Sequence, residues 1–294
     1  FMFKSISKII PSDSLFVRSR MHEVAGELFK KRNEVKYPPI KSIKLQRANW
    51  ERQQIFYVSY ISDPTNQEKI LNSIITILYE TSNFVRDMTS CGVKETTLSF
   101  WKSKNDLQVF VLPTFDVFPD VDEEFHNANL LWEKSFKECS TPQNEINYLI
   151  DIAKYFSIIS TDDVVQQHVY KVTADFVNIL FNNNPEIDGI MYPSARLKNE
   201  KFGINIAFRP EVCDKYLDLT NAVVAHFFKP NNKQELITYY MQSIYCNNIG
   251  RFKYKMCEDY LKDLKYQEKI QNPPVKYSAM KIQYRFPNGK IKRH

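Results

Sequence analysis

Stretches with the periodicity of strands and stretches with the periodicity of helices follow one another along this chain in no regular β-α-β-α alternation. That order favours the α+β class. The 294 residues, 43% of them hydrophobic, suffice for one large domain or for one domain with an appendage. The expected strands lie at 55–60, 96–101, 107–112, 187–192, 203–209 and 221–228, and the expected helices at 66–88, 142–159 and 161–181.

The composition changes at Lys229, where the stretch KPNNK interrupts the pattern. Beyond it, residues 235–246 and 257–270 have helical spacing, and residues 280–293 alternate like a hairpin with Asn-Gly at its turn. We therefore expect a main domain followed by a helical and hairpin extension that packs on the main domain or on a second subunit. The expected boundaries are 1–228 and 229–294.

The positive charge of the chain is concentrated near its end. Residues 251–294 contain 12 Lys and Arg against 4 Asp and Glu, whereas the whole chain has a net charge of +6. A basic tail is more often a solvated surface or a contact between copies than a nucleic-acid groove. We therefore expect no nucleic-acid partner.

Several classes of protein are disfavoured by what the sequence lacks. Its longest apolar runs, such as 72–79 and 221–228, are far shorter than the roughly 20 residues of a membrane span. The first residues do not resemble a signal peptide, and the five cysteines form no C-x-x-C pair. The five histidines show no zinc-site spacing. We expect a cytoplasmic protein with no membrane segment and no metal.

The six glycines are isolated, so the chain has neither a G-x-G-x-x-G motif nor a P-loop. A bound nucleotide would have to be held by side chains rather than by a glycine-rich backbone loop. Arginine suits that task, because its planar guanidinium can bind phosphate through two parallel hydrogen bonds.

Four stretches occur in a characteristic order: QRANWERQQIFYVSYI, ILYETS, VKETTLSFWKSKNDLQVFVL and DGIMYPSARLKNEKFGINIAFRPE. In this order and spacing the chain resembles a RES-domain protein over roughly residues 15–228. That family is named for its Arg, Glu and Ser, and it includes toxins of bacterial toxin–antitoxin pairs. The turn differs from the family's R-x-N-P-x-G-x-P, because Trp50, Arg52 and Gln54 stand in it.

The resemblance assigns the motif residues by position. Arg47 matches the family arginine, Asn49 completes its R-x-N context, Tyr57 matches the tyrosine ten residues after the arginine, and Ser194 matches the serine. Two glutamates compete for the remaining place. Spacing from the tyrosine selects Glu68, whereas the ILYETS context selects Glu80, which we prefer.

The resemblance implies a fold akin to ADP-ribosyltransferases, with a mixed sheet split around a cleft and flanking helices, and it implies chemistry on NAD as substrate. Cleavage of the nicotinamide–ribose bond develops an oxocarbenium-like cation, which a fixed carboxylate can stabilise. Glu80 is expected to supply that carboxylate. Arg47 would bind the diphosphate or a ribose, with Arg18 or Arg20 as a second phosphate contact.

Three further residues are expected at the NAD site on the same grounds. Tyr57 would stack against a ring, Ser194 would hydrogen-bond the nicotinamide ribose or amide, and Tyr192 would line the pocket. Taken alone, each of these residue types is more often structural than functional, so the assignment depends on their order.

The resemblance implies NAD glycohydrolase or phosphorylase activity in a toxin–antitoxin or defence system, with a cognate antitoxin as partner and self-association into a homo-oligomer. An ADP-ribosyltransferase acting on a macromolecule is the alternative within the enzymes. A non-catalytic protein that binds nucleic acid or a partner through the basic C-terminal region is the alternative outside them.

Overall fold

The computed structural model divides the chain into two compact units, each discontinuous in sequence. Unit 1 comprises the described residues within Phe1–Arg18, Lys36–Glu80 and Lys102–Asp218, and unit 2 those within Ser19–Val35, Thr81–Trp101 and Leu219–His294. The structure describes residues 7–22, 28–87, 89–118, 122–159, 163–197, 203–229, 237–246 and 250–256.

Unit 1 is built on a mixed sheet. Its neighbouring strands are, in spatial order, β1 (Ser7–Ile10), β5 (Leu107–Val111), β6 (Gly189–Pro193), β7 (Ile204–Phe208), β3 (Phe56–Ile61) and the first part of β2 (Leu15–Met21). β5 and β6 run parallel, and the other neighbours pair antiparallel. The strands β6 and β7 are buried at every position, and apart from Asn205 on β7 their sequences show no alternation of polar and apolar residues.

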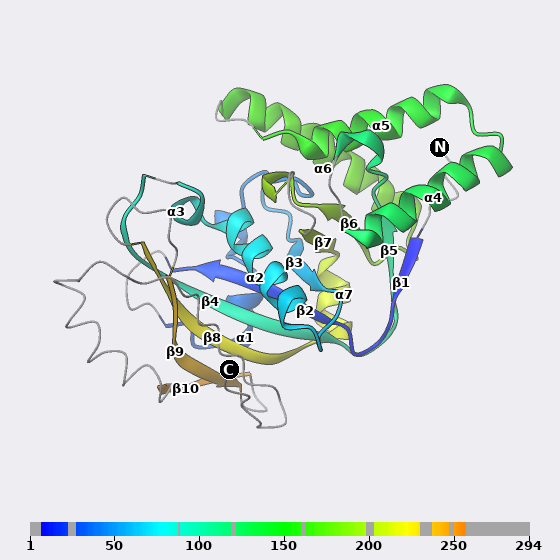
Figure 1. The fold of residues 1–294 in the computed structure, drawn as a ribbon. Helices are drawn as coiled ribbons and strands as arrows, with labels where there is room; N and C mark the ends of the chain where they lie inside the picture. The colour runs from blue at the N-terminus through cyan, green and yellow to red at the C-terminus, as the bar shows by residue number, and fades with distance from the viewer. Residues whose placement is uncertain are drawn as a thin grey trace. The chain divides into compact units, whose positions relative to one another are not determined.

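Helices flank this sheet (Figure 1). They are α2 (Gln67–Thr81), α4 (Glu123–Glu138), α5 (Gln143–Ser157), α6 (Asp163–Asn183) and α7 (Pro210–Tyr216), with short 3-10 turns at Ile40–Ser42, Phe115–Val117 and Ala195–Leu197. The start of α4 is capped by Asp122, whose side chain accepts a hydrogen bond from the Glu124 N–H at 3.2 Å. Pro142 directly precedes α5, and Pro210 begins α7, where a missing N–H costs no helical bond.

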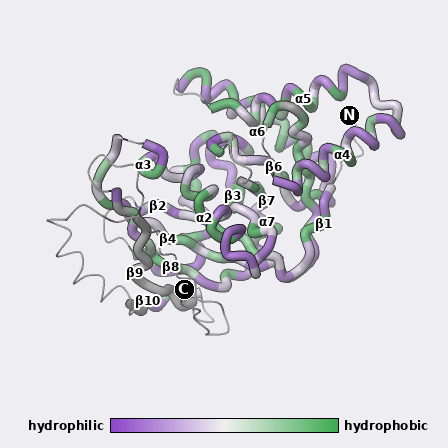
Figure 2. The backbone as a smooth tube through the Cα atoms, in the orientation of Figure 1, coloured by the Kyte–Doolittle hydropathy of each residue, from purple (hydrophilic) through white to green (hydrophobic). Residues whose placement is uncertain are grey.

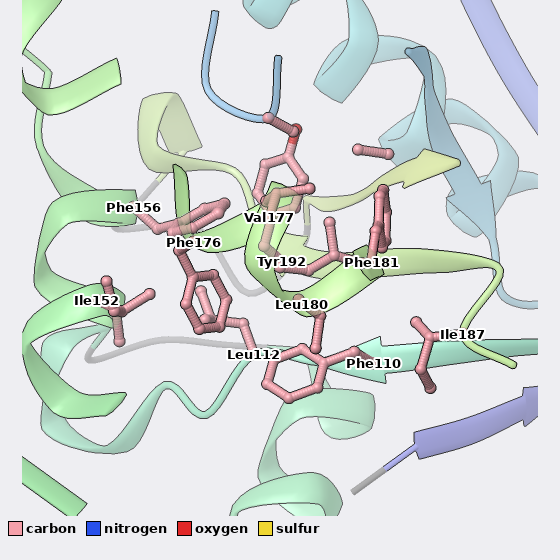
Figure 3. Close-up of a cluster of buried hydrophobic side chains, with 14 of the residues drawn as sticks. Phe110, Leu112, Ile152, Phe156, Phe176, Val177, Leu180, Phe181, Ile187 and Tyr192 are labelled. Carbon is pink, nitrogen blue, oxygen red and sulfur yellow. The ribbon is translucent and has the colours of Figure 1, made fainter. Parts of the chain in front are cut away.

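The main core of unit 1 lies between β5, β6 and β7 and the three helices α4, α5 and α6 (Figure 3). Aromatic rings dominate it: Phe110 packs edge-on against both Trp132 and Phe176. The Trp132 indole N–H donates to the Val111 carbonyl at 3.0 Å, which ties α4 to β5. Figure 2 colours the backbone by hydropathy: apolar stretches lie in the strands, and the helices carry stretches of mixed hydropathy.

Unit 2 contains most of β4 (Gly92–Ser103) and of β8 (Leu217–Lys229), together with β9 (Ile237–Cys246) and β10 (Phe252–Met256), and these strands neighbour one another in that order. It also holds the short helices α1 (Arg32–Lys36) and α3 (Asn83–Arg86). β9 pairs antiparallel with both β8 and β10.

The structure confirms the mixed α+β class, the six predicted strands and the helices predicted at 142–159 and 161–181. The single helix predicted at 66–88 is wrong, because α2 ends at Thr81 and the Ser82 hydroxyl caps a separate turn, α3, at the Val85 N–H. The helix predicted at 235–246 is also wrong. That segment, rich in Tyr, Ile and Thr, forms strand β9, since such residues favour a pleated surface beside a neighbouring strand.

The helix predicted at 257–270 and the hairpin predicted at 280–293 lie outside the described residues. The division into domains at 228 and 229 therefore stays a prediction, as does the likeness to ADP-ribosyltransferases. Within the described part of the chain, no helix is both long enough and apolar enough to cross a membrane.

Candidate functional site

A hydrogen-bonded carboxylate lies where α2 ends and β6 ends, within unit 1. The Ser194 hydroxyl donates to Glu80 Oε1 at 2.5 Å, and the Asn205 amide donates to the same oxygen at 3.1 Å. Glu80 occupies the last turn of α2, Ser194 directly follows β6, and Asn205 lies on β7. Three segments far apart in sequence thus meet at one half-buried carboxylate.

The backbone around Ser194 holds this serine in place. Its N–H donates to the Gly203 carbonyl at 2.7 Å, and its carbonyl accepts from the Leu197 N–H at 3.3 Å. Gly203 has a φ of +117°, a conformation that favours glycine. A Cβ added there would lie only 3.0 Å from the Ser194 Cβ, so the glycine also makes room for the serine.

The Arg-x-Asn stretch and the tyrosine ten residues after the arginine form a second network. The Tyr57 hydroxyl donates to Asn49 Oδ1 at 2.7 Å and accepts from the Ala48 N–H at 2.9 Å. The Asn49 amide in turn donates to the carbonyls of Lys44 and Trp50. Hydrogen bonds within this stretch therefore explain the spacing between Arg47, Asn49 and Tyr57. The Tyr57 hydroxyl and the Asn49 side chain together fix the turn that carries Arg47.

The Arg47 guanidinium is buried against the end of α5. It donates to the carbonyls of Tyr155 (3.3 Å), Phe156 (2.5 Å) and Ile158 (3.3 Å), and it lies 5.5 Å from the centre of the Tyr170 ring. These carbonyls lie in the last turn and at the C-cap, where helical partners are missing and a cation is favoured. Arg47 therefore has a clear structural role, whatever else it does.

Tyr57 and Tyr192 are buried phenols whose pKa values are shifted by nearby groups, Arg47 among them. Burial raises the pKa of Tyr192 well above its usual value, and the neighbouring Tyr57 and Glu80 raise it further, whereas Arg47 lowers it. Burial likewise raises the pKa of Tyr57. The neighbouring Tyr170 raises this pKa further, whereas Arg47 and Arg18 lower it. Both phenols are consequently neutral hydrogen-bonding groups near neutral pH.

Tyr192 connects this region to the core. Its ring lies 5.1 Å from that of Phe156, centre to centre, in the cluster drawn in Figure 3. The strand register pairs it with Asn205 across β6 and β7, so the two residues lie on the same face of the sheet. Tyr192 therefore contacts α5 through Phe156 and lies beside Asn205 of the site.

The other residues that the sequence suggested, Glu68, Arg18 and Arg20, lie in three different places. Glu68 is exposed in the first turn of α2, about 18 Å along the helix from Glu80. Arg18 donates to the Tyr57 carbonyl at 2.7 Å, so it lies beside the second network. Arg20 packs over Phe29 within unit 2. The structure thus gathers Glu80 with Ser194, and Arg18, Arg47 and Asn49 with Tyr57, and leaves Glu68 outside.

Two residues of the site were missed from the sequence. Asn205 is 3% exposed in the otherwise apolar strand INIAF, and an amide at such a position must find a partner. Tyr170 lies on α6 under Arg47, with no motif to mark it. A buried polar residue in an apolar strand was the one signal available.

Among the residues that the structure describes, no group of three His, Cys, Asp or Glu side chains is arranged to hold a metal ion. The chain matches no protein-family model and no curated protein.

Proposed function

We propose that unit 1 cleaves the nicotinamide–ribose bond of NAD, with Glu80 as the residue that stabilises the positive charge of the transition state. The observation that carries this proposal is the hydrogen-bonded set of Glu80, Ser194 and Asn205, in which one donor follows β6 and the other lies on β7. A charge that is held before the reaction needs no reorganisation when the cation develops, which is why fixed carboxylates are effective.

In the proposed reaction the bond between ribose C1′ and the pyridinium nitrogen breaks, and its electron pair goes to the nitrogen. Nicotinamide therefore leaves as a neutral molecule and needs no acid. Water or phosphate then adds to C1′, and with water a proton is released to the carboxylate or to solvent. Positioning and charge stabilisation supply the catalysis, as in glycoside hydrolysis.

Arg47 is proposed to attract the diphosphate of NAD while it caps α5. A guanidinium has five N–H donors, and the three bonds to α5 carbonyls leave donors for a phosphate. Arg18 would add a second positive charge, since it contacts the backbone of Tyr57. The rings of Tyr57, Tyr170 and Tyr192 offer surfaces for the planar groups of NAD.

Incubating the purified chain with NAD tests the proposal, with nicotinamide followed by chromatography. Arms with and without inorganic phosphate distinguish ADP-ribose from its phosphorylated counterpart. A mass increase on added cytosolic protein would instead identify transfer to a macromolecule, the alternative within the same chemistry. We expect nicotinamide release in at least one arm; its absence in all three would refute the proposal.

The RES resemblance extends the proposal to a toxin-like enzyme that a cognate antitoxin blocks. Expression in bacteria with and without the Glu80→Gln substitution tests that extension. Growth arrest that requires the carboxylate, together with a fall in cellular NAD, is the expected result, and equal growth of the two strains would contradict it.

A further inference from the structure

The two oxygens of the Glu80 carboxylate are not equivalent. Both Ser194 and Asn205 donate to Oε1, and neither of these bonds engages Oε2. A carboxylate oxygen has two in-plane lone pairs, so two donors satisfy Oε1. Oε2 is then the oxygen that neither of these two donors occupies.

Asn205 is the member of the set that lies on a central strand of the sheet. It lies on β7 between two antiparallel neighbours, paired with Tyr192 on β6 and with Ser59 on β3. The next-door Ile204 carbonyl accepts a hydrogen bond from the Ser59 hydroxyl at 2.9 Å. A donor on a buried central strand can fix the orientation of a half-exposed carboxylate on a helix end.

We propose that Asn205 is a positioning residue, which together with Ser194 binds Oε1 and so aims Oε2 at the ribose carbon from which nicotinamide departs. The inference rests on the proposed NAD cleavage and adds to it a residue outside the Arg, Glu and Ser pattern. It also changes the role of Ser194. Because the Ser194 proton is directed at Glu80, the serine acts on the carboxylate rather than as a donor to NAD.

A structural amide and a positioning amide respond differently to substitution. Asn205→Ala removes one of the two donors and should lower kcat about 10- to 100-fold with KM for NAD changed less than about twofold, because Glu80 acts in the transition state. Asn129→Ala is the matched control. Asn129 is another amide of unit 1, half-buried and bonded to Thr114 at 2.8 and 2.9 Å, and its loss should leave kcat unchanged.

Asn205→Asp gives a readout that folding does not imitate. A carboxyl group at this position faces Glu80 Oε1, so the two acids titrate as a pair and the second ionisation is displaced upward. While the pair keeps one proton, the introduced carboxyl group can donate it to Oε1 and replace the amide. Turnover by this variant should therefore be highest at acidic pH and fall as pH rises through the second ionisation, whereas the wild-type profile lacks that limb.

Both substitutions are measured on the full chain, with nicotinamide release followed from pH 5 to 9 and folding checked by circular dichroism. A low kcat at unchanged KM for Asn205→Ala, together with acid rescue of Asn205→Asp, supports the positioning role. A kcat equal to wild type in Asn205→Ala, or a pH profile of Asn205→Asp that matches wild type, would overturn the role while NAD cleavage stands. A wild-type chain that releases no nicotinamide would overturn the proposed function and this inference together.

Discussion

Replacing Arg47 by alanine should remove both the structural role of this arginine and its proposed role in NAD binding. The side chain is 7% exposed and makes three hydrogen bonds to the end of α5. Its removal leaves the buried Phe156 carbonyl and the part-buried Tyr155 and Ile158 carbonyls without this donor. The loss should be felt both in stability and in the affinity for a diphosphate.

The expected cost follows from the contacts. A hydrogen bond from a charged group contributes about 1.5 to 3 kcal/mol, and a cation at a helix C-terminus contributes about 0.3 to 1 kcal/mol more. Only the 2.5 Å bond to Phe156 is short, and the two bonds at 3.3 Å are weaker. We therefore expect Arg47→Ala to lower the free energy of unfolding by about 3 to 5 kcal/mol.

Arg209→Ala is the matched control. Arg209 caps α6 as Arg47 caps α5, donating to the carbonyls of Phe181 (2.5 Å) and Asn184 (2.8 Å). Its loss should cost about 2 to 4 kcal/mol by the same reasoning. Because neither the expected phosphate contacts nor Glu80 involves Arg209, its KM for NAD should match that of wild type.

Urea unfolding followed by tryptophan fluorescence measures both variants, since Trp132 is buried in the core of unit 1 and bonded to β5. Among folded molecules, Arg47→Ala should raise KM for NAD at least about tenfold, because a phosphate contact acts already in the ground state. A loss of stability below about 1 kcal/mol would refute the capping role of Arg47. Equal KM values in the two arginine variants would refute the phosphate role and leave the capping role intact.

Gly203→Ala should lower nicotinamide release about tenfold or more and destabilise unit 1 by about 1 to 3 kcal/mol. The reason is that a Cβ at φ +117° is strained and presses on Ser194. Wild-type turnover would show that the serine tolerates the displacement. Burial raises the pKa of the Cys213 thiol to about 12, so the reactive thiolate is scarce at pH 8. Iodoacetamide mapping at pH 8 should label the exposed Cys91 and Cys139 and spare Cys213, and fast labelling of all three would contradict the burial. The folded state keeps the Cys213 proton that the unfolded chain releases from about pH 8.5, so this contribution to stability is present at lower pH and is lost as pH rises toward 12.

Periodicity was sufficient for most elements of unit 1, because they are apolar in a regular pattern. The strands 187–192 and 203–209 are buried on both faces and stand out as short apolar runs, and α5 and α6 have helical spacing. α4 was not predicted, and its first turn carries the acidic residues Glu123 and Glu124. β9 was predicted as a helix, because strand pairing with β8 and β10 lies outside the reach of a local pattern.

The candidate site was predicted in its residue types more than in its contacts. The order of the motifs selected Glu80 and Ser194. In the structure the Ser194 hydroxyl lies 2.5 Å from Glu80 Oε1. The engagement of Arg47 with α5 joins residues more than 100 positions apart, and no spacing rule reveals it. Asn205 lies within the stretch DGIMYPSARLKNEKFGINIAFRPE, but it is not one of the residues that the resemblance assigns, and its contact with Glu80 depends on the neighbouring end of α2.

The most direct test of the account compares nicotinamide release by wild type, Glu80→Gln and Glu68→Gln at equal concentrations of folded protein. Glutamine at position 80 keeps the size and the acceptor oxygen for Ser194 and Asn205 but removes the charge, so release should fall about 100-fold or more. Glu68 is exposed at the far end of the same helix, and its substitution should leave release unchanged. Full activity in Glu80→Gln would contradict the central claim, and loss of activity in Glu68→Gln alone would assign the reaction to the other carboxylate.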